Sequence, residues 1–132
     1  MDLQQSINNQ THVSTTLTTP LLSPPPPPNT NVVFSALSIH VILSLVTASS
    51  KGQTLDQLLG FLKTKGVDEL NTLSSQLVSL ILADGSPSGG PRLCFANGVW
   101  VDKTLDLKPS FKEIVETVYN AASNQVDFQT KV

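Results

Sequence analysis

The stretch NVVFSALSIHVILSLVTA, residues 31–48, decides how the rest of the sequence is interpreted. Of the 17 residues from Val32 to Ala48, twelve are apolar and none is charged. Ser35 stands before the longest apolar run and can act as a helix N-cap, so the pattern predicts a short strand over Val32–Phe34 and a helix over Ala36–Ala48. Because apolar residues fall on nearly every face of that helix, we expect it to be buried inside a larger core.

A membrane span is the alternative for the same stretch. The Ser, His and Thr residues interrupt the apolar run, and 17 residues are at the short limit for about 30 Å of hydrocarbon. No aromatic residues flank the stretch as an interfacial belt would. The sequence therefore favours a buried helix and no membrane partner.

Upstream of this stretch, residues 1–22 form a first helix region and residues 23–30 a proline-rich insertion. Apolar residues four apart predict a helix over Leu3–Leu22, which Pro20 should end or kink. The run Pro24–Pro28 should adopt a stiff, extended polyproline II conformation, and residues 29–31 should then turn the chain.

Downstream, leucine spacing predicts two amphipathic helices, one capped by Thr54 and one over Val67–Ala83. A loop is expected over Asp84–Pro91, a strand covered on both faces over Leu93–Val101, and a further helix beginning at Pro109. Val126–Phe128 is one more strand candidate. The predicted fold class is a mixed α/β or α+β fold, mostly helical, with short strands.

Composition excludes several functional classes. The 132 residues carry a net charge of −2, which does not fit a nucleic-acid partner. One cysteine cannot form an internal disulfide, and one cysteine with two histidines cannot complete a zinc site. The first residues have neither a basic nor an apolar segment of a secretion signal, so we expect a cytoplasmic protein.

No set of residues predicts an enzyme. Cys94 with His12 or His40 could be a nucleophile and base, but Cys94 lies in an apolar strand without a neighbouring cation, and we expect it to be buried. We expect His40 to be a neutral, packed side chain. Two carboxylate pairs, Asp102 with Asp106 and Glu113 with Glu116, are interpreted as solvated faces. The glycine loop from Gly85 to Gly90 is interpreted as a turn, because Pro91 stands where a phosphate loop needs lysine. We expect neither a cofactor nor a metal.

Three motifs in order resemble the serpin family. Asn31-Val-Val-Phe-Ser-Ala-Leu-Ser-Ile-His40 resembles its Asn-Val-x-Phe-Ser-Pro-x-Ser-Ile signature, with Ala36 in place of proline. Lys51-Gly-Gln-Thr54 with Gln57-Leu58-Leu59 resembles its second motif, and Leu93-Cys-Phe-Ala-Asn97-Gly98-Val-Trp100-Val-Asp102-Lys103 with Lys108-Pro109-Ser110-Phe111 resembles its third. The Gly89-Gly90-Pro91 turn, Trp100 and residues 122–128 are most similar to the plant serpin-Z branch.

The resemblance implies an incomplete serpin fold, with residues 31–132 as a truncated, serpin-like N-terminal portion. Serpins trap serine or cysteine proteases through a reactive-centre loop near their C-terminus, and that loop has no counterpart here. The resemblance therefore implies a non-inhibitory chain. Ser35 and Ser38 align with the family's shutter serines, which help to control sheet opening. Because residues 67–83 contain no Lys or Arg, no heparin site is expected.

An interaction protein is the alternative function. The proline run could dock in an aromatic groove of an SH3, WW or profilin-like partner. The strand at Leu93–Val101 could also present an open edge to another chain. We expect a marginally folded or oligomeric species, and family analogy alone would allow an extracellular location.

Overall fold

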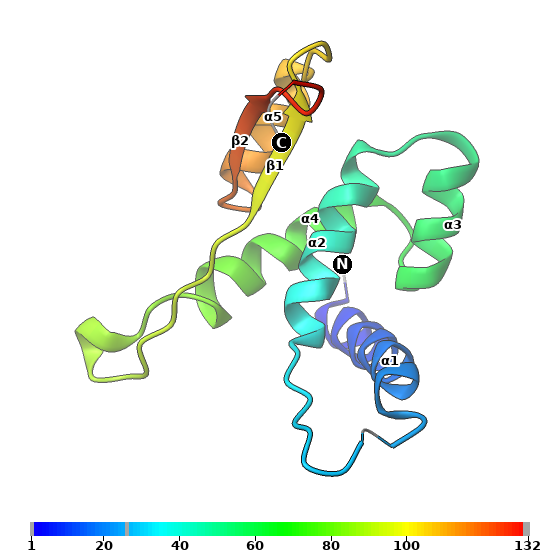
Figure 1. Ribbon diagram of the computed structural model, residues 1–132, viewed down its shortest axis with the longest axis vertical. Helices are drawn as coiled ribbons and strands as arrows, with labels where there is room; N and C mark the ends of the chain where they lie inside the picture. Colours follow the sequence, from blue (N-terminus) through cyan, green and yellow to red (C-terminus); the bar gives the residue numbers. More distant parts are fainter. Residues whose placement is uncertain (1, 26, 131–132) are drawn as a thin grey trace. The chain divides into compact units, whose positions relative to one another are not determined.

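A computed structural model describes residues 2–25 and 27–130 (Figure 1). The chain divides into two compact units, Met1–Leu70 and Asn71–Val132. The first is entirely helical outside its loops, and the second carries a small sheet. The predicted mixed and mostly helical fold with short strands is confirmed.

The first unit is built from α1 (Leu3–Leu22), α2 (Ala36–Ser49) and α3 (Gly52–Leu62), and its last residues begin α4 (Val67–Gln76). Its core forms where Val13, Leu62 and Leu70 meet, each at most 2% exposed. Three half-buried leucines surround that cluster: Leu17, Leu43 and Leu59. Thus leucines from successive helices fill one core, as their helical spacing predicts.

The helix α1 continues past Pro20 to Leu22. The prediction that Pro20 could end the helix is therefore wrong. Pro20 lies in the last turn, where its missing N–H removes only one intrahelical bond and its fixed φ suits a helix. Threonine hydroxyls bond to the carbonyl four residues earlier along this helix, as Thr11 does to Ile7 and Thr18 to Ser14.

The proline run falls partly outside the described residues, because Pro26 does. Pro24, Pro25, Pro27 and Pro28 are exposed and belong to no helix or strand. A turn follows at Pro28–Asn29, and the Thr30 N–H donates to the Pro27 carbonyl over 3.1 Å.

The predicted strand over Val32–Phe34 does not form. Val33 is 93% exposed, and no hydrogen bond from another described residue reaches the backbone of residues 31–34. A strand needs a neighbour for its ladder of hydrogen bonds, and no described residue supplies one.

The helix predicted over Ala36–Ala48 is confirmed as α2, and Ser35 is its N-cap. The start predicted for the next helix is wrong, because α3 begins at Gly52 with Lys51 at the N-cap, and Thr54 lies inside it. Gly52 has a φ of 57°, which lets the chain turn directly from α2 into α3. No helix among the described residues combines the length and the apolar character that a bilayer crossing requires.

The helix predicted over Val67–Ala83 is divided. α4 ends at Gln76 and continues as the π-helix η1 (Leu77–Ile81). The wider turn of a π-helix moves the later side chains off the apolar stripe. Leu73, which lies before the π-helix, is buried, whereas Leu80 and Ile81 inside it are 72% and 58% exposed.

In the second unit, β1 (Gly98–Asp102) and β2 (Ala122–Val126) form a parallel pair linked by α5 (Pro109–Thr117) (Figure 1). The register joins Gly98 to Ala122 and Asp102 to Val126. α5 contacts β2, and Val115 with the following Tyr119 is fully buried. Tyr119 donates its hydroxyl to Asn71 Oδ1 over 2.9 Å, and burial raises its pKa to about 12.

Both predicted strands are misplaced at their boundaries. β1 contains only the second half of Leu93–Val101, and β2 ends at Val126, where the second strand was expected to begin. The expectation of a sheet covered on both faces is wrong for the described chain, because Trp100 is 56% exposed. The Ala122 N–H donates to the Asn97 carbonyl over 3.1 Å, so pairing begins at residue 97, and residues 93–96 have no strand beside them among the described residues.

Candidate functional site

The N-terminus of α2 holds the two serines that the sequence analysis singled out. Ser35 has extended backbone, and its Oγ accepts the Ser38 N–H over 3.1 Å. The Ser38 hydroxyl donates to the same oxygen over 2.9 Å. Ser35 therefore accepts twice, which satisfies one of the free N–H groups at the helix start and fixes the Ser38 rotamer.

This arrangement leaves one donor free. The Ser35 hydroxyl proton has no acceptor among the described residues, and Ser35 is exposed. An acceptor on another segment of polypeptide could bond to it without disturbing the cap. The two serines can thus orient a helix and join a hydrogen-bond network, but they have no base beside them.

His40 lies one turn further along α2 and does not serve as that base. It is 1% exposed, and neither ring nitrogen has a hydrogen-bond partner among the described residues. Burial lowers its pKa, because charging the ring inside the protein would cost solvation. The expectation of a neutral, packed histidine is therefore confirmed.

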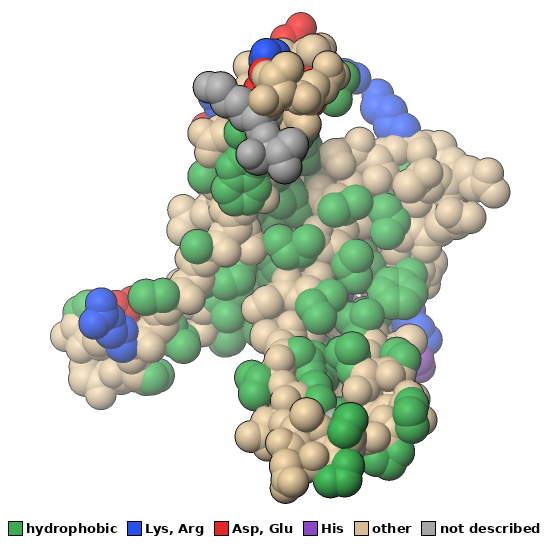
Figure 2. Space-filling view, in the orientation of Figure 1, with side chains coloured by type: hydrophobic (Ala, Val, Ile, Leu, Met, Phe, Trp, Pro, Cys, Tyr) green, Lys and Arg blue, Asp and Glu red, His purple; other side chains and the backbone are tan. Residues whose placement is uncertain are grey.

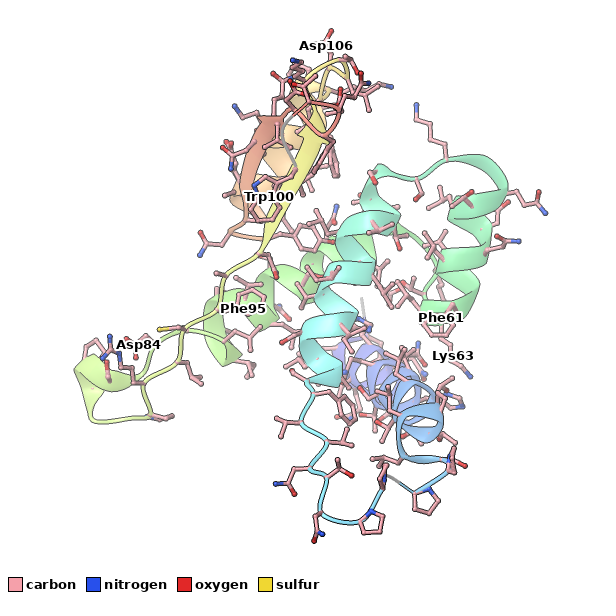
Figure 3. All side chains as sticks on the ribbon, viewed as in Figure 1. Phe61, Lys63, Asp84, Phe95, Trp100 and Asp106 are labelled. Carbon is pink, nitrogen blue, oxygen red and sulfur yellow. The ribbon has the colours of Figure 1, made fainter. Side chains whose placement is uncertain are left out.

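Cys94 is exposed, and the prediction that it is buried is wrong. The segment that carries it does not join the sheet, so its side chain lacks the cover that a strand neighbour would give. Cys94 lines a groove of about 610 Å³ in the second unit beside Phe95 and Asp84 (Figure 3). Neither histidine lines this groove, so the thiol lacks the adjacent base that a nucleophile needs.

The carboxylates near the sheet close loops instead of forming catalytic pairs. Asp102 accepts from the Thr104 N–H, the Thr104 hydroxyl and the Phe128 N–H, and these bonds lower its pKa. Asp127 is paired with Lys103 and accepts from Thr130, which lowers its pKa to about 2. Both groups stay ionised at neutral pH and hold the ends of β1 and β2 together.

Glu116, a member of the second carboxylate pair, makes structural contacts. Glu116 accepts from the Ser123 hydroxyl over 3.2 Å and lies 3.8 Å from the Lys112 ammonium. Within residues 2–25 and 27–130, no three His, Cys, Asp or Glu side chains gather in a way that could hold a metal ion.

One polar cluster was missed from the sequence. Glu69 accepts from Thr64 Oγ1 over 2.9 Å, from the Lys65 N–H over 3.1 Å and from Ser6 Oγ over 3.0 Å. It ties α1, the loop after α3 and the start of α4 into one unit. The local signal was a glutamate in the first turn of α4. It is not a capping box, because Glu69 follows Thr64 by five residues and not by three.

Residues 8–132 match the family model described as serpin, serine protease inhibitor. Serpin-ZX of Arabidopsis thaliana is 51% identical over 131 residues, which are 99% of this chain and 33% of that protein. Serpin-Z7 of Hordeum vulgare is 46% identical over 133 residues, covering 98% of this chain and 34% of that protein. The chain thus spans about a third of the length of the curated relatives it matches.

A solved structure agrees with these sequence matches. The structure of Arabidopsis AtSerpin1 in its native stressed conformation matches with a TM-score of 0.90 and 51% identity. The match covers 99% of this chain and 33% of that one. The backbone of this chain is therefore similar to that of part of a longer relative.

Proposed function

Because the chain belongs to the serpin family, we propose that these 132 residues are part of a serpin scaffold and do not inhibit a protease by themselves. The observation that supports this proposal is that the chain matches only a third of the length of its relatives. In the family the reactive-centre loop lies near the C-terminus, beyond the part matched. Inhibition also requires that loop to enter the family's large sheet. We assign the pair β1 and β2 to that sheet by family analogy.

In the context of a whole serpin, the partners would be serine or cysteine proteases, and Ser35 and Ser38 would act as shutter serines. The free hydroxyl proton of Ser35 supports this role, because it can reach an acceptor on a later segment while the cap stays intact. We propose a cytoplasmic location for the same protein. We propose no catalytic role for this chain, in keeping with a family of protease inhibitors.

The test is a protease incubation of the 132-residue chain. It is mixed with a chymotrypsin-like and a papain-like protease, and the products are separated in detergent. We expect unchanged protease activity and no covalent complex, whereas a full-length inhibitory serpin gives one under the same conditions. A detergent-stable complex between this chain and either protease would contradict the proposal.

The proline run supports a second function, binding to a protein with an aromatic groove. Its described members, Pro24, Pro25, Pro27 and Pro28, are exposed and lie outside helices and strands. Such a segment loses little conformational freedom on docking. Titration of a profilin-like domain with the whole chain should give binding that deletion of Pro24–Pro28 abolishes. Equal affinity after the deletion would exclude this route.

A further inference from the structure

A row of polar side chains on α1 faces the end of α3. Asn9, His12 and Thr16 follow one another at spacings of three and four residues, which places them on one face of the helix. Asn9 Nδ2 donates to the Lys63 carbonyl over 2.6 Å. The Lys63 N–H donates to the Gly60 carbonyl over 3.3 Å. Both backbone groups of Lys63 are therefore held, and its side chain lies beside α1 (Figure 3).

The Lys63 side chain meets the imidazole of His12. Lys63 Nζ lies 3.2 Å from His12 Nε2, and His12 Nδ1 lies 3.4 Å from Thr16 Oγ1. The Thr16 hydroxyl donates its proton to the His12 carbonyl over 3.0 Å, so its oxygen is left to accept from Nδ1–H. These contacts assign the ring proton to Nδ1 and the lone pair to Nε2. Nε2 therefore accepts a hydrogen bond from the Lys63 ammonium.

Other lysines of the chain lie beside carboxylates instead of a base. Lys103 is paired with Asp127, and Lys112 lies 3.8 Å from Glu116. A carboxylate stabilises a lysine in its charged form, which is not a nucleophile. Because α1 contains no Asp, Glu, Lys or Arg, the partner that it offers to Lys63 is an imidazole. Figure 2 shows a histidine beside a basic side chain on the helical unit, with no acidic side chain near them in that view.

The three side chains have the geometry of an activated amine. A nucleophile needs a base within hydrogen-bond reach, and the base is in turn oriented by a third group. Lys63, His12 and Thr16 supply these three groups in that order. All three are exposed and belong to the first unit, so a small solute can reach the amine.

We propose that Lys63 is an acylation site, at which its amine takes an activated acyl group from an acyl phosphate or a thioester without a separate enzyme. His12 Nε2 accepts one proton from the Lys63 ammonium, and the amine nitrogen then bonds to the acyl carbon. The bond from that carbon to the phosphate oxygen or the thiol sulfur breaks, and its electron pair leaves with the phosphate or the thiolate. The second nitrogen proton passes to water, as does the proton held by His12. The product is an amide on Lys63.

This reaction is independent of protease inhibition. It uses surface groups of α1 and the end of α3, and neither a reactive-centre loop nor a large sheet takes part in it. Its test reads a covalent mark on one lysine, whereas the protease incubation reads a complex between two proteins. Failure of either proposal can therefore be told from failure of the other.

The test is incubation of the whole chain with limiting acetyl phosphate or, separately, limiting acetyl-coenzyme A. Peptide mass spectrometry then measures the acetylation rate of each lysine. Lys51, an exposed lysine of the same unit at the start of α3, is the internal reference. We expect Lys63 to react about five times faster than Lys51 or more, with one donor or both, because it has a positioned base. The donor that gives this preference identifies the acyl source.

His12→Gln removes the base and should lower the rate at Lys63 to that of the reference lysine. His12→Ala, which favours a helix, should give the same loss and replaces the first variant if that one lowers the helical circular dichroism. The rate at Lys51 should be unchanged in both variants, because it has no part in the His12 contacts.

Thr16 is a positioning residue, since it acts through the imidazole. Thr16→Val removes the oxygen that orients the ring and should lower the preference for Lys63, whereas Thr16→Ser keeps the hydroxyl and should restore it. Thr15→Val is the matched control, because the Thr15 hydroxyl makes the same kind of bond, to the Thr11 carbonyl over 3.1 Å. It should leave the preference intact.

Two results would overturn the proposal. One is equal acetylation of Lys63 and Lys51 in the wild-type chain with both donors. The other is a preference for Lys63 that persists in His12→Gln and His12→Ala. A loss in Thr15→Val as large as that in Thr16→Val would contradict the positioning role of Thr16.

Discussion

The indole of Trp100 lies over Gly98, two residues earlier on the same face of β1. A Cβ atom on Gly98 would collide with the six-membered ring of that indole. An aromatic ring packed over a strand glycine covers backbone that has no side chain of its own. The pair explains why a glycine is accommodated at the start of a five-residue strand.

Gly98→Ala should therefore displace the indole. Because Trp100 is exposed and its ring is the mobile end of the side chain, we expect the ring to rotate into solvent at a cost of about 1 kcal/mol or less. The chain has one tryptophan, so a red shift of its emission maximum reports the change directly. Gly60→Ala, in a helix with open space around the new Cβ, should leave the emission unchanged.

Ser35→Ala should destabilise the first unit by about 1 kcal/mol, since it removes the N-cap of α2. Ser35→Asp keeps an acceptor at the cap and should retain most of the stability. Urea unfolding followed by circular dichroism measures both changes. Ser49→Ala, which removes an exposed hydroxyl at the other end of the helix, is the matched control. Equal effects of Ser35→Ala and Ser49→Ala would contradict the capping role.

The helices could be predicted from the sequence and the strands only in part. α2 and α5 depend on local signals, namely the cap at Ser35, the proline at position 109 and apolar spacing, and both begin where expected. A strand depends on a partner that local patterns do not reveal. Val32–Phe34 and residues 93–96 have strand-like composition but no strand beside them among the described residues, and the exposure of Cys94 follows from the same cause.

The candidate site could also be predicted only in part from the sequence. Ser35 and Ser38 came from a contiguous motif, and the structure places them in contact. The Glu69 cluster joins residues 63 positions apart, so no spacing in the sequence could identify Ser6 as its third donor. Its existence depends on how α1 packs against the start of α4, which is a property of the folded unit.

The Glu69 carboxylate should make the free energy of unfolding depend on pH in the acidic range, below the ordinary pKa of a glutamate. Its pKa is lowered from 4.5, chiefly by the Lys65 N–H and then by the Thr64 hydroxyl. The stabilisation is therefore present above about pH 4.5 and is lost as the pH falls through the lowered value. Unfolding in urea between pH 7 and pH 3 should show this loss, and Glu69→Gln should flatten it. Glu113→Gln, on exposed α5 surface, should follow the wild type.

Asp127 should titrate at about pH 2, because Lys103 and then Thr130 stabilise its carboxylate. Its contribution to stability is complete above pH 4 and disappears between about pH 4 and pH 2. Carboxyl carbon shifts followed by NMR during acidification measure the midpoint. Lys103→Met should raise that midpoint towards 3.8, and an unchanged midpoint would contradict the ion pair.

His40 should oppose folding once it becomes protonated. Its pKa is lowered by burial, so the neutral ring is stabilised in the fold, and stability falls as the pH drops below about 6.5. His40→Leu removes two unpaired ring nitrogens and should raise the unfolding free energy by about 1 kcal/mol at neutral pH. It should also abolish the loss of stability between pH 7 and pH 5. His12→Gln, at an exposed position, should preserve that loss.

The core around Val13, Leu62 and Leu70 lies entirely within the first 70 residues. A ribosome delivers this segment before any residue of the sheet, so its apolar side chains can be covered while synthesis continues. The strands β1 and β2 emerge later and close on each other across only 24 positions, from Gly98 to Ala122. Each unit can therefore shelter its own apolar residues during translation, and only the edges of the strands must wait for a partner.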